Sequence, residues 1–529
     1  MLKKALPYTV IFLLCALISC SSDDENITFG YTDVKGEWKT ARDFIGELKF
    51  DTQQNKWMFS STEPERNLYD LKENEEAVVS IDNWREEFAD VANGCKINGY
   101  YRLTGIETYS GRSVETHYIT LRVDNITPYP EPEPVVPDLS DKYPFIAGQF
   151  IINTDGGAAI TSKENYVDAT FSFSHTNPEW NLDEVPGGIR GRGNSTWLWY
   201  PKKPYRIKFS KKQSLMGLPK AKSWVLLAEY RDPTKLMNAF VFELGNLMEL
   251  PYTNHNRYVE VVLNGKSQGL YHLTEQVQQN ENRVNVDETE GILMQLDRDD
   301  GPELAPDATD NFWSAIYDLP VCVKNPDKPS PELLETVKET LRPLEEAIKA
   351  GNYARVDELL DIKSMIDFLI IQELVYNVEL DAPRSMYMHK DIGGDKWHMG
   401  PLWDFDAGFD FDWTNMTTSH NYFASYRELV LGTRPATHAG TQYRVPGFFS
   451  DLFKMADFVA RYKARWTEIR PMIKIAMENA EKYYQTNAQL WHTDEQLWPI
   501  GKKSVSEISR LRNWLINRAG YLDTVIAGY

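Results

Sequence analysis

Cysteine is scarce in this chain of 529 residues, which contains only four of them. Cys15 and Cys20 lie in the N-terminal apolar segment, so only Cys95 and Cys322 remain, far apart in the sequence. Disulfide-rich domains and cysteine-ligated zinc sites both need several closely spaced cysteines. The sequence therefore indicates neither a disulfide framework nor a cysteine-based metal site.

Positive charge is also in short supply. The chain has 57 Lys and Arg against 77 Asp and Glu, a net charge of −20. A general nucleic-acid binder needs a basic face to neutralise phosphates, so we expect no nucleic-acid partner. A local basic pocket remains compatible with this charge. Apolar content of 42% is ordinary for a globular protein, and the length suggests two to four domains.

The apolar run near the N-terminus is short. Ala5–Ile18 follows two lysines and cannot span a bilayer as a mature helix. The run ends in Leu-Ile-Ser before Cys20, which resembles a bacterial lipobox. We therefore expect residues 1–20 to be a lipoprotein signal peptide and Cys20 to carry lipid. The chain would then be exported and held, through this lipid alone, at the outer membrane or cell surface of a bacterium.

Motif order predicts a small domain, a linker and a large domain. Residues 21–127 carry short alternating segments between turn residues, which is typical of a β-sandwich of the Ig-like kind. Residues 128–141 are rich in proline, which favours an extended linker. Residues 142–529 read as β-rich to about 325 and helical from about 326. The expected strands of the small domain are 47–50, 56–59, 77–81, 99–104 and 117–123.

A glycine-rich stretch, Gly187–Thr196, lies early in the large domain and contains Arg190 and Arg192. Backbone N–H groups of glycines can approach an anion closely, and the two arginines add positive charge. Behind it, residues 202–209 alternate with a period of two, so Arg206 and Lys208 share one face of a strand. These features suit a polyphosphate. A structural turn and a solvated edge strand explain the same residues.

Two further segments carry clear local signals. Asp232-Pro233 combines an N-cap residue with proline, so we expect a helix from there to about Glu249 that carries Glu243. Asn264-Gly265 between two strand patterns predicts a β-hairpin, and Glu275 follows it. The large domain therefore begins with strands around one early helix.

The large domain is organised around Asn377–Trp413. An apolar helical run, Met365–Tyr376, precedes this stretch. Two short strand patterns, 385–389 and 396–403, lie on either side of Gly393-Gly394. A glycine pair between two strand patterns indicates a hairpin.

Acidic residues lie at one end of this expected hairpin. Glu379 and Asp381 precede its first strand, and Asp404 and Asp406 follow its second. Carboxylates placed together repel each other and need a proton or a cation, and Mg²⁺ prefers carboxylate oxygens. The alternative is that these acids cap turns and remain solvated.

Five motifs in this chain, in this order, resemble those of the CotH (spore coat protein H) family of secreted atypical protein kinases. They cover about 145–470. The resemblance implies an α+β fold: an atypical protein-kinase-like domain of two lobes, here preceded by the small all-β domain, with ATP and a divalent metal between the lobes. The motifs are R-G-R-G-N-S-T, K-K-P-Y-R-I-K-F, W-V-L-L-A-E-Y-R-D-P, N-G-K-S-Q-G-L-Y-H-L-T-E-Q-V and G-P-L-W-D-F-D-A-G-F.

The resemblance also implies nucleotide-binding residues. Lys208 is similar to the strand lysine that pairs with the α- and β-phosphates, and Arg190 lies in the glycine-rich motif before it. Glu243 corresponds to the helix partner of that lysine, with Glu249 as an alternative. Glu275 begins the segment similar to the hinge beside the adenine.

For the reacting end of the nucleotide, the resemblance implies acidic residues. Asp381 or Glu379 corresponds to the acid that orients the attacking hydroxyl. Asp404 corresponds to the acid that binds Mg²⁺ or Mn²⁺, with Asp406 as the second candidate. The chain departs from the kinase pattern because it has no H-R-D or D-F-G motif. Ser385 stands near the place where a metal-binding Asn is expected.

Three functions are compatible with these residues. The first is an exported, lipid-anchored kinase that transfers the γ-phosphoryl group of ATP to Ser/Thr hydroxyls of a protein, the chain itself included. The second is a catalytically weak, kinase-like surface module that binds a structural protein or a glycan. The third is nucleotidyl transfer to a side chain. An assay that follows γ-labelled and α-labelled nucleotide separates them.

Overall fold

The computed structural model divides the chain into two compact units, Met1–Val135 and Val136–Tyr529. In the first unit only the backbone of seven strands is described, so Cys20 and residues 129–141 of the expected linker lie outside the described residues. The second unit is described over residues 143–529, except for 392–393, 395, 412–419, 421–424, 432–435, 439–440 and 444. None of the described helices has the length and apolar content needed to cross a membrane.

The described strands of the first unit pair antiparallel throughout. Each of the five segments expected to be strands overlaps one of β3 to β7. The pairs are β1 with β2, β3 with β4, and β5-β7-β6. Packing of these sheets into a sandwich stays a prediction. The strands are β1 (Gly30–Thr32), β2 (Trp38–Thr40), β3 (Glu47–Asp51), β4 (Lys56–Ser60), β5 (Glu76–Ser80), β6 (Cys95–Thr108) and β7 (Glu115–Pro128).

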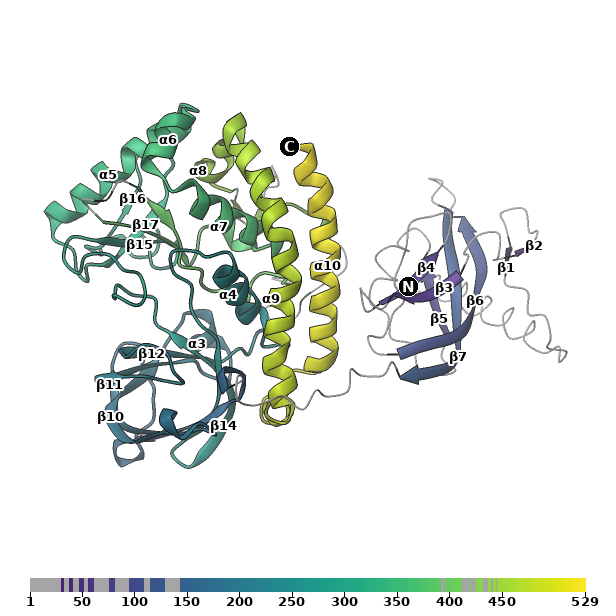
Figure 1. The fold of residues 1–529 in the computed structure, drawn as a ribbon, viewed down its shortest axis with the longest axis horizontal. Coiled ribbons are helices and arrows are strands. Elements are labelled where there is room, and N and C mark those ends of the chain that lie inside the picture. The colour runs from purple at the N-terminus through teal and green to yellow at the C-terminus, as the bar shows by residue number, and fades with distance from the viewer. Residues whose placement is uncertain are drawn as a thin grey trace, which may run out of the picture. The chain divides into compact units, whose positions relative to one another are not determined.

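The second unit begins with a closed barrel of seven strands, in the order β10-β11-β12-β14-β13-β8-β9 (Figure 1). All neighbours are antiparallel except β13 and β8, which are parallel. Inward side chains such as Phe150, Phe171, Ile207 and Trp224 fill its core. The strands are β8 (Gly148–Thr154), β9 (Val167–Ser174), β10 (Leu182–Gly191), β11 (Tyr205–Gln213), β12 (Ala221–Leu227), β13 (Arg257–Leu263) and β14 (Lys266–Glu275).

Local patterns predicted two features of the barrel correctly. Along β11 the odd-numbered residues Tyr205, Ile207 and Phe209 are buried, while Lys208 is exposed, as a period of two requires. The β13–β14 hairpin turns at Asn264-Gly265, and both residues have positive φ, 48° and 75°. That conformation is the one that favours Asn-Gly in tight hairpins.

The glycine-rich stretch differs from the expected turn or loop. Gly187 to Gly191 belong to β10, and only Gly193 lies beyond it with a positive φ of 82°. A Cβ on Gly187 would lie 2.7 Å from the Lys208 carbonyl oxygen, and one on Gly191 would lie 2.5 Å from the Trp197 ring. These glycines therefore permit close packing within the barrel wall.

The remainder of the second unit combines a five-stranded sheet with helices, in the sheet order β16-β17-β15-β18-β19. The described structure is thus α+β, with a sheet-rich part preceding a mainly helical part (Figure 1). Apolar side chains of α4, α7, α9 and the sheet form its large core. The strands are β15 (Ile292–Leu296), β16 (Asn311–Trp313), β17 (Pro320–Asn325), β18 (Met386–Lys390) and β19 (His398–Met399), with β20 (Ala436–His438) and β21 (Thr441–Tyr443) as a separate pair.

Most helices lie in the second half of the chain, as expected. α5 begins at Pro331 with Ser330 as N-cap, which the sequence pattern predicts. The helices are α3 (Ser195–Trp199), α4 (Met237–Leu247), α5 (Pro331–Lys349), α6 (Tyr353–Leu359), α7 (Ile362–Leu374), α8 (Gly447–Ser450), α9 (Ala456–Leu497) and α10 (Ser504–Gly528). Short 3₁₀ turns, among them η6 (Val378–Leu380), connect them.

Two boundaries differ from the predictions. α4 begins at Met237 instead of Pro233, because Lys235 has a positive φ of 62° and the chain turns before the helix. Asp232 still caps the helix, since its carboxylate accepts the Met237 N–H at 2.8 Å. The second strand of the predicted hairpin ends at Met399, because Pro401 has no N–H for the ladder.

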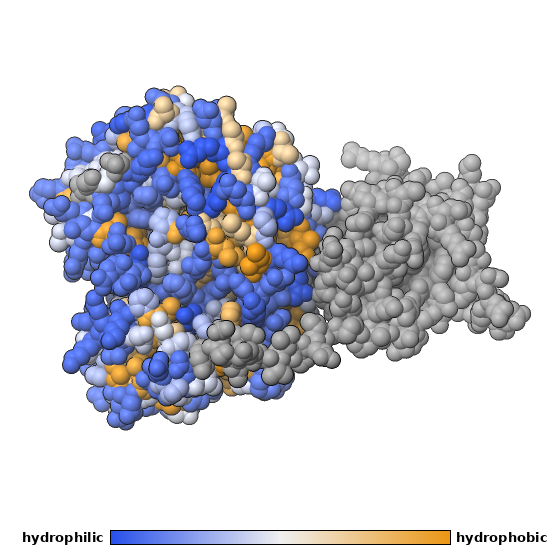
Figure 2. Space-filling model, viewed as in Figure 1, coloured by the Kyte–Doolittle hydropathy of each residue, from blue (hydrophilic) through white to orange (hydrophobic). Residues whose placement is uncertain are grey.

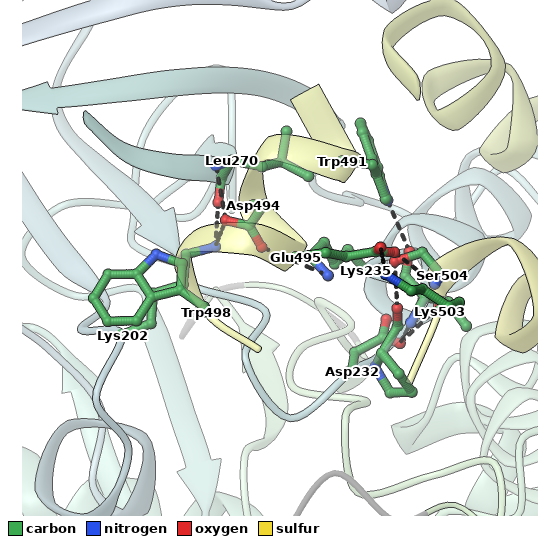
Figure 3. Close-up of polar contacts among 12 residues, drawn as sticks. Lys202, Asp232, Lys235, Leu270, Trp491, Asp494, Glu495, Trp498, Lys503 and Ser504 are labelled. Atoms are coloured by element: carbon green, nitrogen blue, oxygen red, sulfur yellow. Dashed lines mark hydrogen bonds and ion pairs between the residues drawn. The ribbon is translucent and has the colours of Figure 1, made fainter. Parts of the chain in front are cut away.

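A buried polar cluster fastens the C-terminal end of α9 to the barrel (Figure 3). Lys202 Nζ donates to Asp494 at 2.7 Å and also to the Leu270 carbonyl, while the Leu270 N–H donates to Asp494 at 2.9 Å. Lys235 lies 3.6 Å from the other Asp494 oxygen. Trp491 Nε1 donates to the Thr234 carbonyl at 3.0 Å. Residues far apart in the sequence thus hold the barrel to the helices.

On the face shown in Figure 2, hydrophilic residues predominate over the described unit, with small groups of apolar residues between them. Among the described residues, the most exposed large apolar side chains include Leu198 and Trp199 on α3 and Leu304. Scattered apolar residues of this kind are common on soluble proteins.

Candidate active site

Two acidic residues of the site, Asp404 and Asp406, lie on a loop that follows β19, which we call the acid loop (Trp403–Asp406). Phe405 is fully buried, and its N–H donates to Asn238 Oδ1 at 2.9 Å. Asp404 adopts a left-handed conformation with φ of 67°, and its carboxylate accepts from Ser385 Oγ at 3.2 Å. The loop therefore has a defined backbone path set by contacts on both sides.

Glu379 reaches the site from the segment after α7, and Asp381 lies two residues beyond it in the chain. Asn377 caps the short turn η6 by accepting the Glu379 N–H at 3.2 Å. Both acids are 8% exposed. Burial raises the pKa of Glu379 well above its usual range, and the nearby Asp404 raises it further. Glu379 and Asp404, 25 residues apart in the sequence, thus act on each other electrostatically.

Asp406 faces a cation from the barrel side. Arg231, which follows β12, forms an ion pair with Asp406 at 3.5 Å. Burial raises the pKa of Asp406 to about 7; Arg231 opposes this shift, while Asp404 adds to it. The structure therefore brings Glu379, Asp404 and Asp406 into one acidic cluster, in which ionisation of the buried Glu379 and Asp406 is unfavourable without a cation.

Arginine side chains on β10 and β11 and just after β10 supply positive charge, and Asp404 and Asp406 act electrostatically on one of them, Arg192. Arg190 on β10 lies directly across from Arg206 on β11. Arg192 lies with its guanidinium 5.2 Å from the Trp403 ring centre, and Arg190 is equally far from the Tyr166 ring. We call Arg190, Arg192 and Arg206 the arginine wall.

The arginine wall has few partners within the described residues. No ion pair between described residues involves any of its three members. The Nε atoms of Arg190 and Arg206 are buried without a hydrogen-bond partner there. Burial lowers the pKa of Arg192 and Arg206, although Asp404 raises that of Arg192. Buried guanidinium donors without acceptors are costly, so the wall is suited to receive an anion.

Lys208 lies on the same outer face of the barrel but farther along it. In the β10–β11 register, Lys208 pairs with Gly188, two residues from the Arg190–Arg206 pair and on the side away from Arg192. Two residues along a strand span about 6.6–6.8 Å. The Lys208 side chain is exposed, and no described residue forms an ion pair with it.

The lysine–glutamate pair implied by the resemblance is not formed. Glu243 instead accepts from Asn256 Nδ2 at 2.9 Å, because its side chain lies on the face of α4 turned toward β13 and α9. Glu275, at the end of the last barrel strand, accepts the His255 N–H at 2.9 Å and contacts the His255 ring at 2.7 Å. Both carboxylates are thus engaged within the fold, away from the acid loop residues.

Three residues of the site were missed by sequence reasoning: Glu229, Arg231 and Asn238. Glu229 and Arg231 belong to the motif W-V-L-L-A-E-Y-R-D-P, whose charges lie directly after a buried strand. All three side chains are buried, at 7%, 5% and 5% exposure. Charged residues next to a buried strand were an available signal, but the pattern did not indicate what they contact.

Metal ligation can be tested on the donor set. Among the described residues, no group of three or more His, Cys, Asp or Glu side chains has the geometry to hold a metal ion. Mg²⁺ commonly uses only one or two carboxylates and completes its shell with water and substrate phosphates. The pair Asp404 and Asp406, one of which is buried with its ionisation disfavoured, fits that second mode.

A comparison with protein-family models matches residues 189–522 to the family described as CotH kinase protein. A search of curated proteins finds no match to the chain. The matched region begins in β10 and includes the arginine wall, α4, the acid loop and most of α10. Because it covers more than half of the sequence, the chain is a kinase-like protein and belongs to the CotH kinase family.

Proposed function

We propose that this protein is a phosphotransferase that moves the γ-phosphoryl group of ATP to a Ser or Thr hydroxyl of a protein, its own chain included. The observation that carries the proposal is the arginine wall, half-buried and short of acceptors, together with an acidic cluster of which Asp404 and Asp406 act electrostatically on Arg192. A polyphosphate with a divalent cation supplies the charges that both sides need.

In this proposal the arginine wall binds the phosphates of the nucleotide. Guanidinium groups donate in a fork that matches phosphate oxygens, and they remain charged even when buried. Arg192 lies in the electrostatic field of Asp404 and Asp406, so it would hold the phosphate nearest the acids. Lys208, farther along the strand, would assist at the rim. Barrel and helical part would form the two lobes of the kinase-like fold, joined after Glu275.

Asp404 and Asp406 would hold Mg²⁺ or Mn²⁺. When bound, the cation neutralises charge on the phosphates and helps to position them. A cation there also offsets the repulsion that raises the pKa values of Glu379 and Asp406. Both aspartates raise the pKa of Glu379, so Glu379 would lie close to the bound cation.

Asp381 would orient the acceptor hydroxyl. The hydroxyl oxygen forms a bond to the γ-phosphorus while the bond from that phosphorus to the β–γ bridging oxygen breaks, and ADP leaves. The hydroxyl proton passes to the Asp381 carboxylate. Asp381 lies directly after η6, two residues beyond Glu379, so it is close to the acidic cluster without being one of the proposed cation ligands.

Labelled nucleotide tests the proposal directly. The purified chain with Mg²⁺ and γ-labelled ATP should incorporate label into itself or an added protein, and α-labelled ATP should not. Label from the α position would instead identify nucleotidyl transfer. Absence of label, together with absence of any Mg-ATP effect on melting, would overturn the proposal in favour of a non-catalytic binding module.

We also propose that the protein is exported and anchored through lipid on Cys20, on the basis of the charged start, short apolar run and Leu-Ile-Ser-Cys sequence. Cys20→Ala should leave the exported protein in the soluble fraction. If the variant still sediments with membranes, the anchor is elsewhere.

A further inference from the structure

We propose that Asn238 is a positioning residue that sets the acid loop, and that Glu229 and His272 hold its amide in the required orientation. This inference rests on the function proposed above, because the acid loop carries the proposed cation ligands. Asn238 is the second residue of α4 and is 5% exposed.

The first step is the contact with the loop. Asn238 Oδ1 accepts the N–H of Phe405 at 2.9 Å, and Phe405 lies between Asp404 and Asp406. One hydrogen bond therefore restrains the peptide that joins the two acids. The fully buried Phe405 ring holds the other side of this residue, so the backbone has little freedom to shift.

The second step is the orientation of the amide. Asn238 Nδ2 donates to both oxygens of Glu229, at 3.3 and 3.2 Å. The other contact of Glu229 is His272 Nδ1, at 3.0 Å. His272 is fully buried and stacks on Tyr258, with ring centres 4.9 Å apart. A flipped amide would turn its oxygen toward a carboxylate and its NH₂ toward the Phe405 N–H, so one orientation is strongly preferred.

The third step is a second contact with the acid loop, made by the segment that contains Glu229. Arg231, two residues after Glu229, pairs with Asp406 at 3.5 Å. Asp232 accepts the N–H groups of Thr234 and Met237 and thereby starts α4 one residue before Asn238. Residues 229–238 thus contact the acid loop twice, at the Phe405 N–H and at the Asp406 carboxylate. A shift of this segment relative to the helices would therefore displace the loop that carries both acids.

The inference is tested by exchanging the two partners. In Asn238→Asp a carboxylate would face the Glu229 carboxylate, and repulsion should displace the loop. Adding Glu229→Gln reverses the pair, because the amide introduced by this second change can donate to the new carboxylate and still accept from His272. Asn246→Ala is the matched control, since Asn246 lies on the same helix and bonds the Phe242 and Asn254 carbonyls instead.

Hydrogen exchange without nucleotide is the primary measurement. In Asn238→Ala and Asn238→Asp, peptides that span 402–409 should exchange about 3–10-fold faster, the effect of losing one hydrogen bond. Peptides from β15 and β17 should be unchanged, and the double variant should return to wild-type rates. Affinity for Mg²⁺ in the presence of ATP, followed by melting, should fall about 10-fold in the single variants and recover in the double variant.

Two results would overturn the inference: unchanged exchange at 402–409 in a folded Asn238→Ala protein, or a double variant that exchanges as fast as Asn238→Asp. The exchange readout needs no ligand, so it separates the two proposals. Faster exchange at 402–409 in the single variants, with no Mg-ATP effect on the melting of wild type, would support the loop contact and overturn the phosphotransferase function.

Discussion

Two buried clusters of charged side chains in the second unit differ in how their charges are paired. At the join between the barrel and α9, Lys202 meets Asp494 at 2.7 Å (Figure 3). At the acid loop, Arg231 meets Asp406 only at 3.5 Å. No ion pair or side-chain hydrogen bond among the described residues involves the Glu379 carboxylate.

This difference separates a structural cluster from a ligand site. A buried charge is tolerated when a partner and further hydrogen bonds satisfy it, and the Leu270 N–H and Lys235 complete the environment of Asp494. The acidic cluster lacks that completion, so Glu379 and Asp406 favour protonation, while buried donors of the arginine wall lack acceptors. A cation bound to an anion would supply a counter-charge for the acids and acceptors for the arginines.

The largest effect should come from breaking the structural cluster. Asp494→Asn leaves Lys202 buried without its counter-charge and should lower the free energy of unfolding by about 3–5 kcal/mol. Glu478→Gln on the same helix is the control, because its pair with Lys474 is exposed and surface pairs contribute about 0–1 kcal/mol. Thermal melts of both variants measure this. A folded Asp494→Asn variant should still gain stability from Mg-ATP. Loss of that gain would mean that the structural cluster also contributes to ligand binding.

The next effect tests the acidic cluster. Asp404→Asn should keep the fold, since it relieves repulsion with Glu379, but should reduce phosphoryl transfer on the order of 10²–10³-fold. Mg-ATP should raise the melting temperature of wild type much more than that of the variant, because only ligand bound to the folded state shifts melting. Asp307→Asn, an exposed acid, is the control. Equal ligand shifts in wild type and Asp404→Asn would transfer the role to Asp406.

Acid placement also allows the roles of Asp381 and Asp404 to be separated. Asp381→Asn should retain the Mg-ATP melting shift and lose transfer, because its proposed task is to orient the hydroxyl and accept its proton. Titration of nucleotide by melting, together with turnover on γ-labelled ATP, distinguishes the two variants. Loss of nucleotide binding in Asp381→Asn would place this acid on the cation side.

A smaller effect is expected from replacing either of two basic side chains near the barrel wall. Arg192→Ala should weaken nucleotide binding about 10–100-fold, because a buried guanidinium opposite the acids loses its contact with phosphate. Lys208→Ala should weaken it less, since Lys208 is exposed and one step farther along the strand. Equilibrium binding of a labelled nucleotide gives both values. A larger loss for Lys208→Ala would return the phosphate role to the lysine.

The last effect concerns pH and is small when it is measured over a single pH unit. The pKa of Asp406 is raised to about 7, so the folded state retains a proton that the unfolded chain loses near pH 4. This group's contribution to stability is therefore full below about pH 4 and is lost as pH rises toward 7, by at most about 1.4 kcal/mol per pH unit. Asp406→Asn should flatten that part of the stability curve, measured by melts at several pH values. An unchanged slope would mean that Asp406 is ionised in the apo protein.

Local patterns determined much of the fold. Alternation along residues 205–209, the Asn264-Gly265 turn and the Ser330 cap each appear where the sequence predicts them, because they depend on neighbours only a few residues away. The motifs also indicated the family, and the matched region, 189–522, overlaps most of the range of about 145–470 expected from them. The order of the segments also indicated that acidic residues lie before and after one hairpin.

Tertiary structure decided which of the candidate charges meet. Closure of the barrel brought Arg192 near Asp404 and Asp406 and left Lys208 farther along the wall, although alternation alone treats Arg206 and Lys208 alike. Packing of α4 decided that Asn238, and not Glu243, reaches the acid loop. Strand periodicity fixes the face on which a side chain lies, whereas its partner depends on elements that approach from distant parts of the chain and on the burial that makes an unpaired charge costly.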